Sequence, residues 1–283
     1  MVANILHFSG GILHNGGYAR GPPQTKHKQI LIPMKKYITL LAVFAFLGVA
    51  ALFFKVGSRV MTPAVSNTET RTAHISETTA NENDHHMIDL PEPVTEGTMS
   101  VEEALQLRRS IRSYSEKPLR LDQLSQLLWA AQGITNERGF RTAPSAGATF
   151  PLEMFVVANN VENLSVGIYH YLPHDHRLEL LRDEDVSSPL FRACLSQSMI
   201  LDGAAVLVFA AVFDRTTSRY GERGERYVYN EIGHAGQNVH LQAAALDLGT
   251  VVIGAYRDDE VEDILQLGDR YRVLYLMPVG KLD

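Results

Sequence analysis

Short apolar runs and helical stripes alternate along the second half of the chain. The runs are rich in β-branched and aromatic residues, a composition that predicts strands. They span Leu152–Ala158, Gly167–Leu172, Arg177–Leu181, Ala204–Phe213, Thr250–Tyr256 and Val273–Val279. The second and third runs flank a turn, so they predict a hairpin between Tyr169 and Leu180.

Apolar residues at helical spacing predict three helices. A capping box at Ser100–Glu103 starts a first helix that runs to about Arg108. A second helix covers residues 121–131 and is followed by a glycine. The longest helix is expected over Glu225–Leu248. Its apolar stripe consists of Val228, Ile232, Ala235, Val239, Ala243 and Leu246.

Because helices and strands are interspersed in this order, the sequence predicts an α+β fold with a mixed sheet flanked by helices. We place this folded domain at residues 99–283. The 45% hydrophobic content of the chain provides for one sizeable core.

A long uncharged segment precedes the folded domain. Tyr37–Phe54 is apolar throughout and is flanked by lysines on both sides. At about 1.5 Å per residue it nearly spans a hydrocarbon core of about 30 Å, so we predict a single transmembrane helix. A cleaved signal peptide is the alternative, with Met34–Lys36 as its charged start. Residues 1–36 form a tail, and Met34 is a natural start of translation.

Polar residues dominate the segment at 55–98. Ser, Thr, Asn, Glu and His leave too little apolar surface to offset the entropy of the chain, so we predict a disordered linker.

Charge and cysteine content exclude several classes of site. A net charge of −6 and a pI near 6.0 argue against nucleic-acid binding. Cys194 is the only cysteine, so neither an intrachain disulfide nor a thiolate metal cluster can form. His170, His174 and His176 fall in the predicted hairpin, two of them in its exposed turn. We therefore predict no metal site.

Two segments carry residues suited to binding an anion. Arg108, Arg109, Ser110 and Arg112 place three guanidinium groups and a hydroxyl at the end of the first helix. Arg108 and Arg112 share a face if the helix persists, although basic residues also occur at helix ends merely to compensate the dipole. Small residues at 144–148 let backbone N–H groups approach a flat or negatively charged ligand.

Two further segments are of interest. Glu231, His234 and Asn238 form a polar stripe on the long helix, which we interpret as hydrogen bonds that lock a buried helix. Gly249 and Gly254 bracket the fifth predicted strand, and a ring could approach its backbone closely there.

Five motifs in this order resemble the nitroreductase superfamily of FMN-dependent oxidoreductases, and especially its branch that includes azoline oxidases of peptide maturation. The motifs read RRSIR, RTAPSAGATFPLE, YGERGERYVYNEIGHAGQN, LGTVVIGAY and VLYLMPVGK. The resemblance covers about Met99 to Lys281. It implies FMN as the cofactor.

The resemblance also implies roles for particular residues. The phosphate and ribityl chain would be held by Arg108, Arg109, Ser110 and Arg112, with Lys281 as the remaining basic group after the last strand. The flavin ring would meet Pro144, Ser145, Ala146 and Gly147, mainly from a partner subunit, so a homodimer is implied. The other face would meet Val252, Ile253 and Gly254, with Gln197 as a further candidate.

The azoline-oxidase branch uses a Lys–Tyr pair in proton abstraction, and this chain has Arg219 and Tyr220 there. Arginine stays protonated and is a poor base, so azoline oxidation itself is in doubt. Tyr220 is a candidate proton donor, or a packed tyrosine. The expected function is a membrane-anchored oxidoreductase that moves hydride or electrons between flavin N5 and a small-molecule or peptide substrate. A general NAD(P)H nitro- or quinone reductase and a non-catalytic flavin-binding scaffold are the alternatives.

Charges beside the apolar segment predict its orientation. Five basic residues precede it and two follow closely, which favours an N-terminus inside the cytoplasm and a flavin domain outside. Counted from Met34, the bias is two against two. In the outward orientation no NAD(P)H pool is available to the domain.

Overall fold

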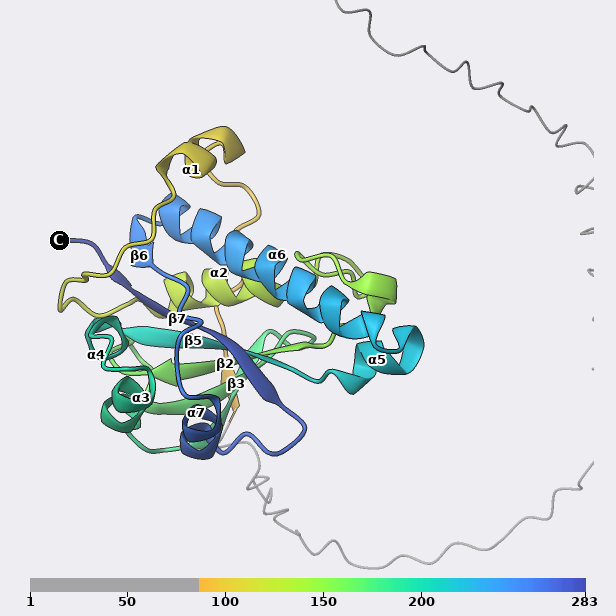
Figure 1. Ribbon diagram of the computed structural model, residues 1–283. Helices are drawn as coiled ribbons and strands as arrows, with labels where there is room; N and C mark the ends of the chain where they lie inside the picture. The colour runs from red at the N-terminus through yellow and green to blue at the C-terminus, as the bar shows by residue number, and fades with distance from the viewer. Residues whose placement is uncertain (1–86) are drawn as a thin grey trace, which may run out of the picture. The chain divides into compact units, whose positions relative to one another are not determined.

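The computed structural model describes residues 87–283. Their centre is a seven-stranded sheet in the order β1-β4-β3-β2-β5-β7-β6 (Figure 1). The strands are β1 (Met87–Asp89), β2 (Leu152–Ala158), β3 (Gly167–Leu172), β4 (Arg177–Arg182), β5 (Ala205–Ala211), β6 (Leu248–Thr250) and β7 (Arg272–Lys281). Each neighbouring pair is antiparallel. The α+β class is confirmed, but the prediction of a mixed sheet is wrong.

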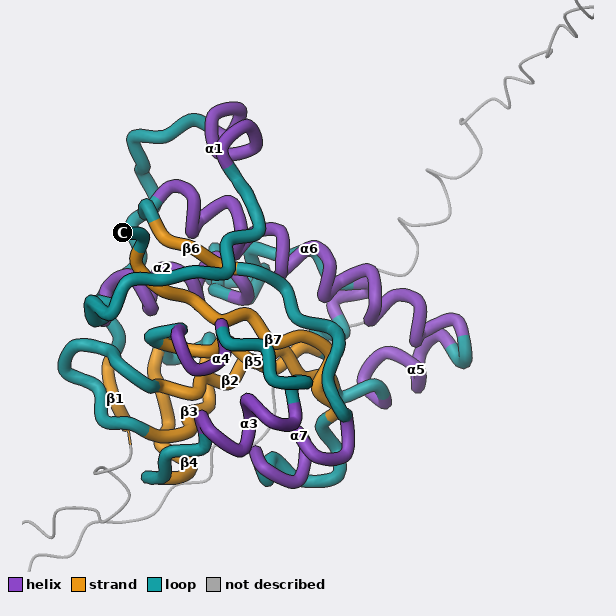
Figure 2. The backbone as a smooth tube through the Cα atoms, turned by 60° about the vertical axis from the view of Figure 1, so that its left-hand side comes forward, coloured by secondary structure: helices purple, strands orange, loops and turns teal. Residues whose placement is uncertain are grey.

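Helices cover both faces of the sheet. They are α1 (Val101–Leu107), α2 (Leu121–Gln132), α3 (Ser187–Ala193), α4 (Met199–Asp202), α5 (Asp214–Tyr220), α6 (Arg223–Ala245) and α7 (Asp258–Leu265). The helices α2 and α6 pack on one face, and α3, α4 and α7 pack on the other (Figure 2). The short helix α1 stands against the C-terminal half of α6 (Figure 1).

Burial of the central strands explains their sequence. Every residue of β5 is buried, because strands flank it on both sides and helices cover both faces. The apolar stripe of α6 packs into the same core as β2, so it is enclosed within the chain. The predicted hairpin is confirmed as β3 and β4, which pair antiparallel. Ser100 caps α1 as expected, since its hydroxyl accepts a hydrogen bond from the Glu103 N–H at 3.1 Å.

Two expected boundaries differ from the structure. The strand predicted over Thr250–Tyr256 is observed as the shorter strand β6, which begins earlier, and beyond Thr250 the only pairing with β7 among the described residues is an isolated bridge from Ile253 to Leu276. The strand β1 lies inside the predicted linker and pairs with β4. Leu90, just after it, is buried in the core. The linker prediction is therefore wrong for residues 87–90.

The predicted transmembrane segment, Tyr37–Phe54, lies outside the described residues, together with the tail and most of the predicted linker. Among the helices between residues 87 and 283, none has the length and apolar composition that a membrane crossing needs.

Candidate functional site

The basic cluster lies on extended backbone. The helix α1 ends at Leu107, and Arg108 has φ −49° and ψ 123°. The helix does not persist beyond the end that the sequence predicts, so Arg108 and Arg112 do not share a helical face. The segment instead follows the edge of the sheet, where Ile111 N–H donates to the Thr250 carbonyl at 2.9 Å. Ser115 N–H donates to the carbonyl of Lys281 at 2.9 Å.

Tyr114 anchors this segment to the sheet. Its hydroxyl lies 2.9 Å from the Ile111 carbonyl and 3.1 Å from that of Pro278, and it donates to them. Burial raises the pKa of Tyr114 well above its ordinary value. Its ring covers Gly280 and Gly249, where an added Cβ would lie 2.5 and 2.9 Å from Tyr114 atoms. At Gly249, the close approach predicted for a ligand ring is thus made by a side chain of the same protein.

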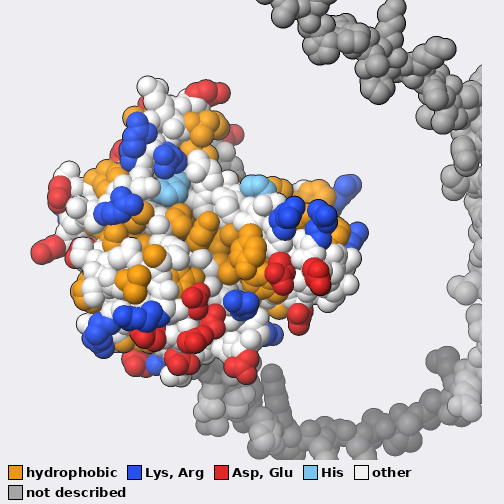
Figure 3. All heavy atoms as spheres, in the orientation of Figure 1, with side chains coloured by type: hydrophobic (Ala, Val, Ile, Leu, Met, Phe, Trp, Pro, Cys, Tyr) orange, Lys and Arg blue, Asp and Glu red, His pale blue; other side chains and the backbone are white. Residues whose placement is uncertain are grey.

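A pocket of about 200 Å³ lies between the basic segment and α6. It is lined by Leu107, Arg108, Arg109, Ile111, His240, Ala243, Ala244, Asp247, Leu248, Thr250 and Leu282. Basic side chains gather on this face of the protein near α1 (Figure 3). Arg109 also donates to the carbonyls of Gln106 at 2.9 Å and Arg108 at 2.8 Å, so it caps the end of α1. Sequence reasoning missed His240 as a member of this pocket.

The small-residue loop contacts the predicted catalytic pair. Gly147 has φ +62°, and an added Cβ would lie 2.4 Å from the Tyr220 hydroxyl. The Arg219 guanidinium donates to the Gly147 carbonyl at 2.9 Å. Ser145 accepts a hydrogen bond from the Phe150 N–H at 2.9 Å, which closes the loop. The chain therefore brings Arg219, Tyr220 and Gly147 together.

A buried carboxyl group lies next to Ser145 of this loop. Glu231 of α6 is 2% exposed, and burial raises its pKa to about 7. The Ser145 hydroxyl and the Arg141 guanidinium favour its charged form and act against this rise. Arg141 is fixed by a 2.7 Å hydrogen bond to the side chain of Gln132. Within residues 87–283, Oε1 of Glu231 is enclosed and has no hydrogen-bond partner.

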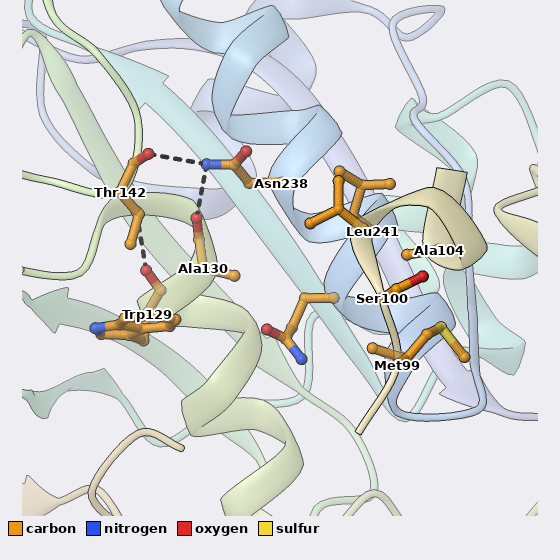
Figure 4. A pocket seen from close by; sticks show the side chains of 11 residues that line it. Met99, Ser100, Ala104, Trp129, Ala130, Thr142, Asn238 and Leu241 are labelled. Atoms are coloured by element: carbon orange, nitrogen blue, oxygen red, sulfur yellow. Dashed lines mark hydrogen bonds between the residues drawn. The ribbon is translucent and has the colours of Figure 1, made fainter. Parts of the chain in front are cut away.

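The other two residues of the polar stripe on α6 differ in their surroundings. Asn238 donates to the carbonyls of Ala130 at 3.1 Å and Thr142 at 3.3 Å, so it locks α6 to its neighbours as expected (Figure 4). His234 is exposed.

No group of residues that could hold a metal ion occurs in the part of the chain that the structure describes. The sequence predicts two of the hairpin histidines in an exposed turn. His176 is instead partly buried, and its Nε2 lies 2.8 Å from the Ser125 hydroxyl.

The segment after β6 is fixed to β7 by one backbone bridge. Ile253 exchanges hydrogen bonds with Leu276 at 2.8 and 3.0 Å, while Gly254 is exposed and Val252 is partly buried. The Gln197 side chain donates to the Ala255 carbonyl at 2.8 Å, so it lies beside this segment.

One chain holds the basic pocket and the small-residue loop apart. Arg108 lies close enough to His240 to affect its pKa, whereas Ser145 affects the pKa of Glu231. Glu231 precedes His240 by nine residues on α6. At 1.5 Å per residue this separation is about 14 Å along the helix. The structure therefore assembles each group locally, at a different position along α6.

An apolar groove of about 250 Å³ opens on the same side of the sheet (Figure 4). Its walls come from α1, α2 and α6 and include Met99, Val101, Ala104, Trp129 and Leu241. Three apolar side chains of α1 are also more than half exposed, namely Val101, Leu105 and Leu107.

Known proteins share both the sequence and the fold. The sequence profile of the nitroreductase family matches residues 105–281, which is more than half of the chain. The chain is 47% identical over 183 residues to "Putative nitroreductase MJ1384" of Methanocaldococcus jannaschii, covering 65% of this chain and 91% of that protein.

A second relative is the microcin B17-processing protein McbC of Escherichia coli, 32% identical over 136 residues. The match covers 46% of this chain and 50% of McbC, or half of that relative's length. A solved "putative nitroreductase" from Ralstonia eutropha superposes with a TM-score of 0.61 at 28% identity, over 81% of this chain and 97% of that one. The resemblance in the five motifs is confirmed, and the chain belongs to the nitroreductase family.

Proposed function

We propose that the protein is an FMN-dependent oxidoreductase. The observation that carries this proposal is the pocket beside α1, in which two arginines and a histidine meet at the start of the segment that leads to Gly254. These groups fit a phosphate, because guanidinium and N–H groups donate to its oxygens. When bound, a flavin supplies a planar acceptor and donor of hydride at N5.

Within this proposal, the phosphate end is held by the basic cluster. Arg108, Arg109, Ser110 and Arg112 bind it, and Lys281 at the end of β7 adds charge. The ring end lies along Val252, Ile253 and Gly254, with the Gln197 amide beside them. The exposed glycine leaves room for a planar group, whereas a larger side chain would occupy that space.

We further propose a homodimer, because the resemblance implies that the small-residue loop meets a flavin held mainly by a partner subunit, and α1 offers exposed apolar side chains to such a partner. Pro144, Ser145, Ala146 and Gly147 of one chain then complete the site of the other. The exposed apolar side chains of α1 and the groove beside them are the surface that a second copy buries. The inner stripe of α6 is already buried within the chain, so the outward side of α6 makes the contact.

In this proposal, Arg219 and Tyr220 have different roles. Arg219 remains charged and holds the loop through the Gly147 carbonyl. The Tyr220 hydroxyl lies next to Gly147 and is the group that holds or donates a proton toward a substrate. The substrate is a small molecule or a peptide, and similarity to a peptide-processing protein supports the second class.

A second candidate is a general nitro- or quinone reductase that takes its hydride from NAD(P)H. Similarity over 91% of the length of a relative named as a nitroreductase favours it. Both candidates require redox turnover, whereas a scaffold would not show it.

The test is a redox cycle of the purified full-length chain. A reductant should bleach a flavin absorbance band, and an added quinone or oxygen should restore it. A protein that carries flavin but cannot be reduced and reoxidised is a scaffold, and that result would contradict the proposal.

A further inference from the structure

His240 is placed in the basic pocket by α6. Its side chain is only 7% exposed and lines the pocket with Arg108 and Arg109. Among the described residues, its Nδ1 atom is enclosed and has no hydrogen-bond partner. Nε2 is not enclosed in this way, so it is the ring nitrogen that can reach a ligand in the pocket. A buried polar atom without a partner is uncommon in folded proteins, which makes His240 a candidate for binding a ligand.

The surroundings of His240 favour the neutral form of its ring. Burial lowers the pKa of His240, and the charge of Arg108 lowers it further. Protonation would also place an N–H on Nδ1, where no acceptor lies within reach. Three charged groups line the pocket with it: Arg108 and Arg109 from the segment after α1, and Asp247 from beyond the end of α6. The hydroxyl of Thr250 donates to the Pro278 carbonyl at 2.9 Å and so is already engaged.

We propose that His240 binds the phosphate monoester in this pocket through a neutral Nε2–H donor. The inference rests on the proposed function, which puts the FMN phosphate there. A phosphate dianion offers acceptor oxygens only, so the proton of the neutral ring belongs on Nε2. The arginines supply charge, and His240 supplies a donor of fixed direction that distinguishes FMN from riboflavin.

Three variants of the full-length chain separate this role from packing. The terminal amide nitrogen of H240Q can take the place of Nε2, whereas the shorter amide of H240N takes the place of Nδ1. H240L has no donor. After the flavin is stripped, FMN and riboflavin are titrated by fluorescence, and thermal melting shows which variants remain folded.

A donor at Nε2 predicts that H240N and H240L bind FMN about tenfold more weakly, whereas H240Q stays within about threefold of the parent chain. Riboflavin affinity should be the same in all four proteins. With ¹⁵N-labelled histidine in the FMN complex, His240 should show the Nε2–H tautomer and no titration from about pH 6 to 8.

Two results would overturn the inference alone: a parent chain that binds FMN while H240N and H240L bind it equally well, or a His240 that is cationic in the complex. A parent chain that binds neither FMN nor riboflavin overturns the proposed function and this inference with it.

Discussion

Single residues decide whether the basic cluster holds an anion. Arg108 lines the pocket, and Arg112 lies four residues along the same exposed strand-edge segment. Replacing either with alanine should weaken FMN binding about tenfold, because a hydrogen bond to a charged group contributes about 1.5–3 kcal/mol. Arg192→Ala on α3, on the opposite face of the sheet, is the matched control and should change nothing. Unchanged dissociation constants in both cluster variants would refute the phosphate assignment.

Glu231 predicts a pH dependence of stability. Its carboxyl releases its proton at about pH 4.3 in the unfolded chain, but at about 7 in the folded one. Because the folded-state pKa is raised, the stability that Glu231 contributes is complete below about pH 4 and declines as the pH rises to about 7. The decline is on the order of 3 kcal/mol.

Glu231→Gln cannot titrate, so its free energy of unfolding should lack this decline. Urea unfolding across that range should show the variant gaining on the parent chain as the pH rises. A constant difference between the two proteins would show that the buried carboxyl does not titrate there.

At the scale of elements, the small-residue loop depends on glycine at one position. Gly147 has φ +62°, and the Tyr220 hydroxyl occupies the space that a Cβ would need. Gly147→Ala should therefore destabilise the fold by about 1–2 kcal/mol. Gly233→Ala on α6, where nothing lies within 4 Å, should stabilise it by about 0.5–1 kcal/mol. Chemical denaturation measures both, and equal effects would contradict this account of the loop.

Most elements were predictable because their patterns are strong. The strands β2, β5 and β7 consist mainly of apolar residues, and α6 carries a long apolar stripe. Short elements lack such patterns: α4 has four residues, and β1 has three within a polar segment. Strand direction depends on tertiary contacts that no local pattern encodes. The order of helices and strands alone therefore led to the wrong expectation of a mixed sheet.

The site was predictable where a motif is local. Local motifs identified the small-residue loop and the pair Arg219–Tyr220, but only the fold shows that the two are in contact. The predicted end of the first helix near Arg108 agrees with α1, which ends at Leu107, but the turn of the chain onto the sheet edge was not foreseen. His240 was missed because it follows Val239 in the apolar stripe, and only the packed structure shows its contact with the basic pocket.

At the scale of the whole molecule, the proposed dimer puts α1 at the interface. Leu105 is 53% exposed, so a charge there should not disturb the fold of one chain. Leu105→Glu should yield a monomer with weakened flavin binding, because burying a charge at an interface is costly. Leu181→Glu on β4, which is 40% exposed away from α1, is the control and should remain dimeric. Light scattering decides, and a dimeric Leu105→Glu protein would contradict this interface.

The proposed membrane anchor also predicts a topology. The basic residues before Tyr37–Phe54 outnumber those after it, so we propose that the flavin domain lies outside the cytoplasm. A reporter that works only outside the cytoplasm should then be active when it is fused after Asp283, and a reporter that works only in the cytoplasm should be inactive there. Activity of a cytoplasmic reporter instead would reverse the orientation and put the flavin domain within reach of the NAD(P)H pool.

The central claim is that this chain holds FMN, and the chromophore itself tests it most directly. The full-length protein should be yellow when purified, and heat should release one flavin per chain that chromatography and mass spectrometry identify as FMN. A well-folded, colourless protein that takes up no FMN when it is supplied would contradict the account.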